Sequence, residues 1–150
     1  MSVAVREIVA TEWIERAWPL LEAHREELTT NPDLMVLDPD IARYQALEAA
    51  GAMLSLGLFK GDDLVGYSIN ALFTNLHYGD LLVCQNDLLF IHRAHRKGMA
   101  GVRLIATTES MAKDRGAQMM LWHAKPNTAL HAMLPRMGYR VQDIVYSQVL

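Results

Sequence analysis

The chain has 150 residues, of which 51% are hydrophobic and 21% charged, and its formal net charge is −3. This length suits one domain over residues 1–150, and the composition is too apolar for a disordered protein. No apolar run approaches the roughly 20 residues that cross a bilayer, and the N-terminal residues lack the pattern of a secretory signal. The lone Cys84 can form no internal disulfide. We therefore expect a cytoplasmic protein that does not bind a membrane.

The first half of the chain predicts a strand, two helices and a set of antiparallel strands. Alternation over Val3–Ile8 indicates a strand near an edge or end of a sheet. Thr11 is a possible cap for the following helix, which Pro19 should kink or break. Asp38-Pro39 is typical of the start of a second helix, which should stop at Gly51. Apolar runs separated by turn residues then predict a meander of strands over residues 53–59, 64–73 and 81–91.

A basic loop follows the last of these strands. Residues 88–105 contain four cationic side chains and no acidic one, and helical spacing begins after Gly98. The first turn of a helix offers unpaired N–H groups and the positive end of the helix dipole. Gly98 allows a phosphate to approach the backbone closely, and Arg and Lys add hydrogen bonds. This pattern predicts an anion site at the loop.

The rest of the chain predicts a strand, a short helix and the end of the sheet. Met119–His123 should lie parallel to the preceding strand, after a right-handed crossover. Asn127 is a possible cap for the last helix, which Pro135 should shorten. Tyr139–Val149 is expected to complete the sheet, as one strand or as two strands broken near Asp143. The whole pattern is α+β, with helices on both faces of a mixed sheet.

Charge is divided unevenly along the chain. Residues 1–87 carry 5 basic and 14 acidic side chains, whereas residues 88–150 carry 9 basic and 3 acidic ones. Blocks of like charge can simply be surfaces that face water and have no binding role. Alternatively, the basic half holds an anionic cofactor and the acidic half attracts a cationic substrate such as an amine. A basic excess over the whole domain is absent, so direct binding of duplex nucleic acid is not expected.

The basic loop reads His95-Arg96-Lys97-Gly98-Met99-Ala100, and the last helix is bounded by Asn127 and Met137-Gly138-Tyr139. These segments resemble the GNAT superfamily of acyl-CoA-dependent N-acyltransferases. The family's pyrophosphate signature is Arg or Gln, two residues, Gly, one residue, and Gly or Ala. His95 departs from the first position, although Arg93 and Arg96 flank it. The resemblance covers Leu81–Leu150 well and the first half only in element order.

This resemblance implies a fold, a co-substrate and a binding site. The implied fold is a mixed, mostly antiparallel sheet of six or seven strands with helices on both faces. The implied co-substrate is acetyl-CoA, held by the loop, with backbone N–H groups of the preceding strand facing the oxyanion. The implied cofactor-binding residues are Leu88, Leu89, Phe90, Arg93, His95, Arg96, Lys97, Gly98, Met99, Ala100, Gly101 and Asn127.

Acetyl transfer to an amine requires a neutral nucleophile. An alkyl amine with a pKa near 10 is only about one part in a thousand neutral at pH 7, so a base assists the reaction. Asp87 is the first candidate, because it is the only acid on the strand expected to hold the thioester, although it could be a plain surface carboxylate. His123, at the end of the next strand, is the second candidate, although it could be an ordinary core or loop histidine.

The general acid of the family is missing at its usual place. Many members use a Tyr four residues before the Gly of the last helix, and this position is Leu134 here. Tyr139 and Tyr146 are weak replacements. A thiol with a pKa near 8.5 can leave unprotonated at a cost of about 2 kcal/mol at pH 7, so the loss is tolerable.

Two functions follow from these observations. The first is an N-acetyltransferase that moves an acetyl group from acetyl-CoA to a primary amine by direct attack in a ternary complex. The second is a non-catalytic acyl-CoA-binding or assembly module of the same fold. The acceptor amine could belong to a small molecule, a protein or a modified nucleobase, and a homodimer is possible.

A metal site is not expected, because His92, His95 and His123 show no tight ligand spacing.

Overall fold

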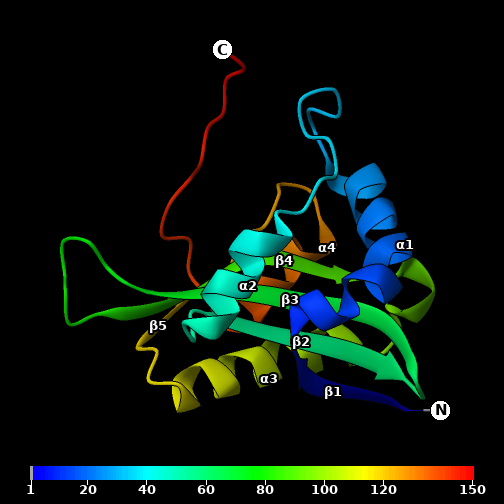
Figure 1. Cartoon of the computed structure of the whole chain (residues 1–150), viewed down its shortest axis with the longest axis horizontal. Helices are drawn as coiled ribbons and strands as arrows, with labels where there is room; N and C mark the ends of the chain where they lie inside the picture. The colour runs from blue at the N-terminus through cyan, green and yellow to red at the C-terminus, as the bar shows by residue number, and fades with distance from the viewer. Residues whose placement is uncertain (1) are drawn as a thin grey trace.

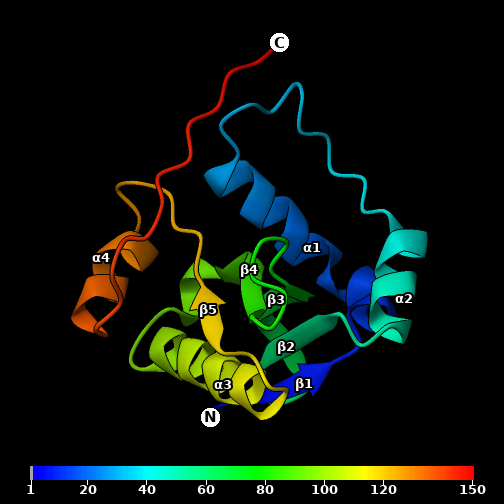
Figure 2. The ribbon, with the colours of Figure 1, turned by 90° about the vertical axis from the view of Figure 1, so that its left-hand side faces the viewer.

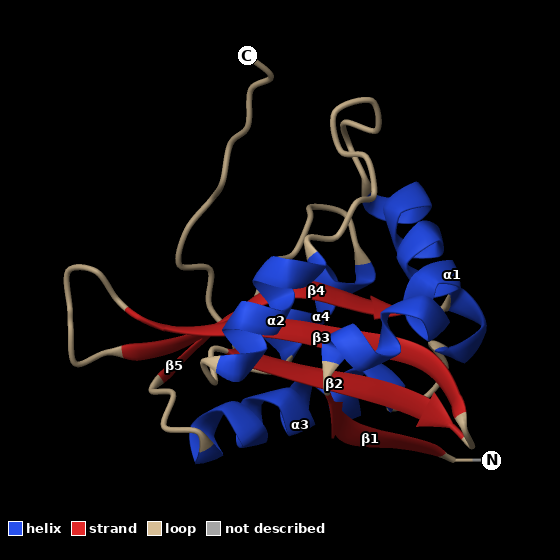
Figure 3. Cartoon of the chain, viewed as in Figure 1, coloured by secondary structure: helices blue, strands red, loops and turns tan. Residues whose placement is uncertain are grey.

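The computed structural model describes residues 2–150 and has a five-stranded sheet with helices on both faces (Figures 1 and 3). In chain order the elements are β1 (Val3–Ile8), α1 (Ala10–Leu28), α2 (Ile41–Ala49), β2 (Met53–Lys60), β3 (Asp63–Thr74), β4 (Leu82–Ile91), the 3₁₀ helix η1 (Arg93–His95), α3 (Ala100–Asp114), β5 (Met119–Leu121) and α4 (Ala129–Arg136). The strands lie in the order β1-β2-β3-β4-β5, and only β4 and β5 are parallel. The predicted edge strand, antiparallel meander and parallel crossover are therefore confirmed.

Apolar side chains cover both faces of the sheet. On one face, Leu54 and Leu56 of β2 pack with Leu104 of α3. On the other face, Tyr67 and Phe90 pack with Leu20 and Leu21 of α1. Figure 2 shows α1 and α2 on one side of the sheet and α3 on the other. This two-sided burial explains the continuous apolar run of β2, because a strand covered on both faces shows no polar alternation. Within residues 2–150, no helix is both long enough and apolar enough to cross a bilayer.

The first helix differs from the sequence prediction at Thr11, and it is not broken at Pro19. It begins at Ala10, so Thr11 lies inside the first turn and its hydroxyl donates to Glu48 of α2 at 2.7 Å instead of capping the helix. The helix also continues through Pro19 to Leu28, so of the kink or break predicted there the break does not occur. Next to Pro19, Leu20 packs against Tyr67 and Phe90 of the sheet, and this packing supplies the stability that the lost hydrogen bond removes.

The second helix begins two residues later than predicted. Its first residue is Ile41, and the Asp40 carboxylate accepts a hydrogen bond from the Arg43 N–H at 3.0 Å. A capping side chain must stand immediately before the helix to reach this N–H group. The segment Asp38-Pro39 therefore belongs to the connection between α1 and α2 and does not start the helix.

The C-terminal segment is the largest departure from the sequence prediction. Residues 139–150 form no strand, so the sheet has five strands and not six or seven. The segment leaves the sheet and extends away from it (Figure 1), with Val141, Ile144, Val145 and Tyr146 exposed. Its residue types favour a strand, but a strand forms only where a neighbour accepts its backbone hydrogen bonds. Residue preferences in this segment therefore predicted more strands than the sheet contains.

Candidate active site

A β-bulge interrupts β4 at Asp87. Leu88 is opposite Ile69 of β3, whereas Asn86 is opposite Asn70, so Asp87 has no partner in the ladder. An extra residue of this kind bends the strand and redirects a side chain. Asp87 is exposed, and it lines the cavity described below. The bulge therefore places the first candidate base where the strand changes direction.

Three buried polar side chains support this bulge. Asn86 Nδ2 donates to the Asn70 Oδ1 at 2.9 Å and to the Leu88 carbonyl at 3.0 Å. Asn70 Nδ2 in turn donates to the Leu54 carbonyl at 2.9 Å and to the Ser68 hydroxyl at 3.0 Å. Hydrogen bonds of this kind are strong when water is excluded. The network therefore fixes the distorted part of β4 against β3 and β2.

Beyond the bulge, β4 has an open edge. The parallel pairing with β5 covers only Val83–Gln85 of β4. The His92 N–H donates to the Val65 carbonyl of β3 at 2.9 Å. Because backbone groups alternate between the two sides of a strand, those of Leu89 and Ile91 point away from β3 toward the open edge. The N–H groups of these two residues can therefore serve an extended ligand or a developing oxyanion.

The basic loop connects this edge to α3 in a conformation that suits an anion. Gly98 has a φ of +72°, a value that other residues rarely adopt, and nothing lies within 4 Å of where a Cβ would stand. α3 starts at Ala100, and no side chain caps its first turn. The N–H groups of that turn thus face the loop without a side-chain acceptor, which is the arrangement that binds phosphate groups.

Arg96 of this loop is already engaged by the protein. Its guanidinium donates to both carboxylate oxygens of Glu27 in α1, at 2.7 and 2.8 Å, and to the Ile91 carbonyl at 2.7 Å. It also lies over the Phe90 ring, 5.2 Å from the ring centre, and it lowers the pKa of the Glu27 carboxyl. Arg93 and Lys97 are exposed on the same loop. They are better placed than Arg96 to contact a phosphate, because most donors of the Arg96 fork are used.

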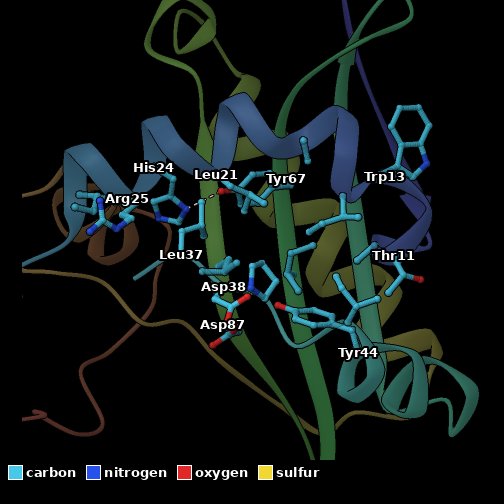
Figure 4. A pocket seen from close by; sticks show the side chains of 18 of the residues that line it. Thr11, Trp13, Leu21, His24, Arg25, Leu37, Asp38, Tyr44, Tyr67 and Asp87 are labelled. Carbon is cyan, nitrogen blue, oxygen red and sulfur yellow. Dashed lines mark hydrogen bonds between the residues drawn. The ribbon is translucent and has the colours of Figure 1, made fainter. Parts of the chain in front are cut away.

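A cavity of about 440 Å³ lies between α1, α2 and the sheet, beside the bulge (Figure 4). Side chains from α1, α2, β3, β4 and the connection between α1 and α2 form its walls. This volume falls within the range of pockets that hold small molecules. Asp87 and Leu88 belong to both the wall and β4, so the bulge of β4 forms part of the cavity.

One wall of the cavity contains a neutral histidine. His24 Nδ1 lies 2.8 Å from the Tyr67 hydroxyl, and the His24 ring stacks on Phe90 with 4.8 Å between ring centres. Burial lowers the pKa of His24 from 6.5 to about 4, although the nearby Glu27 carboxylate acts in the opposite direction. Burial also raises the pKa of the Tyr67 hydroxyl. Both groups are uncharged at neutral pH, so this wall adds no charge to the cavity.

We expect His24 to make the fold less stable in acid. Its pKa is about 4 in the folded chain and 6.5 ordinarily, so the unfolded chain takes up the proton first as the pH falls. The stability that neutral His24 contributes is complete above about pH 6.5 and is lost as the pH falls toward 4. Thermal unfolding between pH 7 and 4.5 should therefore show a smaller loss of Tm in His24→Phe than in the unmodified chain. His131→Phe, at an exposed position of α4, is the control, and equal losses in all three proteins would contradict the assignment.

The remaining predicted residues lie after β5. His123 is exposed in the loop that follows the strand and is not part of the cavity wall. Lys125 of the same loop does line the cavity, and its ammonium donates to the Leu28 carbonyl of α1. Asn127 has a φ of +61° and is not the cap of α4; the Thr128 hydroxyl accepts from the His131 N–H at 3.3 Å instead. Among residues 2–150, no group of three or more metal-ligating side chains is arranged to hold an ion.

Comparison with known proteins identifies the family. The family model described as "Acetyltransferase (GNAT) family" matches residues 10–139. The chain belongs to the GNAT acetyltransferase family. A comparison with curated proteins found no significant match.

Solved structures of GNAT proteins share the fold of this chain. An aminoglycoside acetyltransferase from an uncultured soil metagenomic sample has a TM-score of 0.78 at 16% identity, over 100% of this chain and 99% of that chain. A ribosomal-protein-alanine N-acetyltransferase from Brucella melitensis biovar Abortus 2308 has a TM-score of 0.70 at 19% identity, over 99% of both chains. A putative acetyl transferase from Pyrococcus furiosus has a TM-score of 0.75 at 13% identity, over 99% of this chain and 100% of that chain. These low identities establish the fold alone.

The GNAT chain has no tyrosine acid on its last helix, since Leu134 is buried there. Tyr139 donates its hydroxyl to Glu109 of α3, and burial together with this bond raises the pKa of Tyr139 to about 12. Tyr146 is exposed in the C-terminal segment. Neither hydroxyl lies on the cavity wall, so neither is placed beside Asp87.

Proposed function

We propose that this GNAT protein transfers an acetyl group from acetyl-CoA to a primary amine by direct attack in a ternary complex. The observation that supports this most is the bulge at Asp87, which puts a carboxylate between the open edge of β4 and the cavity. A thioester along the edge and an amine in the cavity would then meet at one carboxylate. Holding two reactants in this way removes much of the entropic cost of their encounter.

The residues of the loop and of β4 suit acetyl-CoA. The first-turn N–H groups of α3, Arg93 and Lys97 supply positive charge for the phosphates, and Gly98 leaves room for a close approach. The Leu89 and Ile91 N–H groups supply donors for the acyl carbonyl as it gains negative charge. We therefore assign the cofactor contacts to these groups and give Arg96 a supporting role.

The proton and the leaving group can be followed through the reaction. Asp87 accepts a proton from the ammonium group of the acceptor, and the free amine nitrogen bonds to the thioester carbon. The carbon–sulfur bond then breaks and CoA leaves as its thiolate. The attacking nitrogen gives up its second proton to that thiolate or to solvent, so the products are a neutral amide and the CoA thiol. Leu134 offers no proton to that thiolate, which is tolerable because thiolates are good leaving groups.

The alternative is a non-catalytic acyl-CoA-binding module, suggested by His95 at the first position of the signature and by Leu134. Incubation with labelled acetyl-CoA and a panel of primary amines separates the two functions. Labelled amide product, with release of one CoA for each amide, supports the transferase. Tight binding of acetyl-CoA without turnover of any amine supports the module.

The acceptor should be cationic, and its apparent KM should rise with salt. The first half of the chain carries 14 acidic and 5 basic side chains up to Asp87, and this half forms most of the cavity wall. Attraction between exposed charges weakens as the screening length falls to about 10 Å at 0.1 M salt. Initial rates at saturating acetyl-CoA and 0.02 to 0.2 M KCl test this. A neutral or anionic best substrate, or a KM that does not depend on salt, would contradict it.

A further inference from the structure

The cavity walls are predominantly apolar. Aliphatic side chains come from α1, from the connection between α1 and α2, and from the sheet; they include Ile14, Leu21, Leu37, Ile69 and Leu88. Leu21 and Ile69 belong to the apolar core on this face of the sheet, and Leu37 and Leu88 pack against it. A ligand in contact with these walls gains free energy by removing apolar surface from water. The walls therefore select for an apolar body.

The cations on the wall are already used by the protein. The Arg25 guanidinium donates to the carbonyls of Met35 and Pro32, at 2.9 and 2.7 Å. The Lys125 ammonium donates to the Leu28 carbonyl. These bonds hold the connection between α1 and α2 and the loop after β5 in place around the cavity. Both cations are thereby directed toward backbone carbonyls of the protein.

Within the described chain, the two carboxylates on the wall form no ion pair with the protein. Asp38 comes from the connection between α1 and α2, and Asp87 comes from the bulge of β4. In the view of Figure 4 both side chains lie along the lower side of the cavity. The ion pairs of residues 2–150 join Arg96 to Glu27 and Arg115 to Glu7, so they use neither carboxylate. The wall therefore carries two carboxylates that are not used in these ion pairs and that can accept from a cationic ligand.

We infer that the acceptor is a monoamine whose ammonium group is attached to a bulky apolar body, as in an arylalkyl or branched alkyl amine. The ammonium lies between Asp38 and Asp87, and the body lies against α1 and Leu37. This inference rests on the proposed function, because Asp87 then serves both as a partner of the ammonium and as the base.

A sugar-like polyamine fits the cavity poorly. Most of the wall is apolar, so several of its hydroxyl groups would face aliphatic side chains without a hydrogen-bond partner, which is costly for a buried polar group. Its additional ammonium groups would find no third carboxylate on the wall, since Asp38 and Asp87 are the only acidic residues that line the cavity in the described chain. The same argument disfavours a short hydroxylated amine.

The experiment compares kcat/KM for 2-phenylethylamine, isoamylamine, ethylamine, 1,4-diaminobutane and kanamycin with acetyl-CoA. We expect 2-phenylethylamine to exceed ethylamine by at least tenfold, because pocket contacts with apolar groups discriminate at this level. Preference for kanamycin or 1,4-diaminobutane would overturn the inference and leave the transferase function intact.

Two matched pairs of variants locate the binding site. Leu37→Ser should reduce the preference for 2-phenylethylamine over ethylamine at least threefold, and Leu34→Ser should not. Leu34 is in the same connection but is 66% exposed and is not part of the wall. Asp38→Asn should weaken binding of 2-phenylethylamine at least tenfold, whereas Asp33→Asn, also off the wall, should not. If the two variants of either pair change amine binding or preference equally, the amine does not lie against Leu37 and Asp38 as placed.

Calorimetry separates this inference from the transferase function. 2-Phenylethanol has the same apolar body without the charge, so its binding should be unaffected by Asp38→Asn and weakened by Leu37→Ser. If no amine is acetylated but 2-phenylethylamine still binds with these responses, the ligand class stands and the transferase function fails. If 2-phenylethylamine neither binds nor reacts, the inference is wrong.

Discussion

Asp87→Asn should lower the rate of acetyl transfer at pH 7 about 10²-fold or more, the size of effect that general-base catalysis supplies. The substitution removes the base but keeps nearly the same shape at the bulge. It does not remove the buried Asn86–Asn70 bonds that support the bulge. The variant should therefore fold and still bind acetyl-CoA. Single-turnover rates with saturating acetyl-CoA and amine measure the effect.

The loss should shrink as the pH rises. An amine with a pKa near 10 becomes its own free base at high pH and then needs no carboxylate to take the proton. Rates of both proteins from pH 7 to 10 should therefore converge. Asp80→Asn, in the exposed connection between β3 and β4, controls for the loss of a negative charge. Full activity of Asp87→Asn with loss of activity in His123→Ala would move the base to the loop after β5, and activity in both would indicate positioning and a water chain alone.

Gly98→Val should weaken CoA binding at least tenfold, or about 1.4 kcal/mol. A β-branched residue is strained at the φ of +72° that Gly98 adopts. Its side chain would also fill the space within 4 Å that the protein leaves empty beside the loop. Both effects act on the surface that we assign to the pyrophosphate. Isothermal titration with CoA gives the affinity directly.

Gly51→Val is a matched control for this variant. Gly51 has a φ of +68° and equally open surroundings, but it lies in the turn between α2 and β2. It should show a similar loss of stability with unchanged CoA affinity. If folded Gly98→Val binds CoA as tightly as the unmodified chain does, the loop is not the pyrophosphate site.

Local pattern predicted most of the sheet and helices of this protein. The run of apolar residues in β2 marked a strand buried on both faces, and the change to helical spacing after Gly98 marked the start of α3. These features depend on residues close together in the sequence, and periodicity reports them directly. The parallel pairing of β4 with β5 followed from the same reasoning, because a helix between two strands leads to a crossover.

The features that the sequence did not reveal depend on partners far apart in the chain. Glu27 meets Arg96 across 69 positions, and the His24 hydrogen bond to Tyr67 spans 43. The bulge at Asp87 depends on a register that no single strand encodes. Polar Asn86 and Asn70 within mostly apolar strands were the available signals for it, because a buried amide needs a specific partner. The strand prediction for the C-terminal segment was wrong for the same reason, because the strand preference of its residues does not supply a neighbouring strand.

The bond between Glu27 and Arg96 limits how this protein could be redesigned. α1 supplies part of the cavity wall that we assign to the acceptor, and near its C-terminal end the same helix holds the basic loop through Glu27. The two halves of the site are therefore not interchangeable modules. A helix grafted from another enzyme to change acceptor choice would also release Arg96, unless it carried a carboxylate at the Glu27 position. Directed changes of specificity are better confined to the connection between α1 and α2, which lines the proposed acceptor cavity without carrying Glu27.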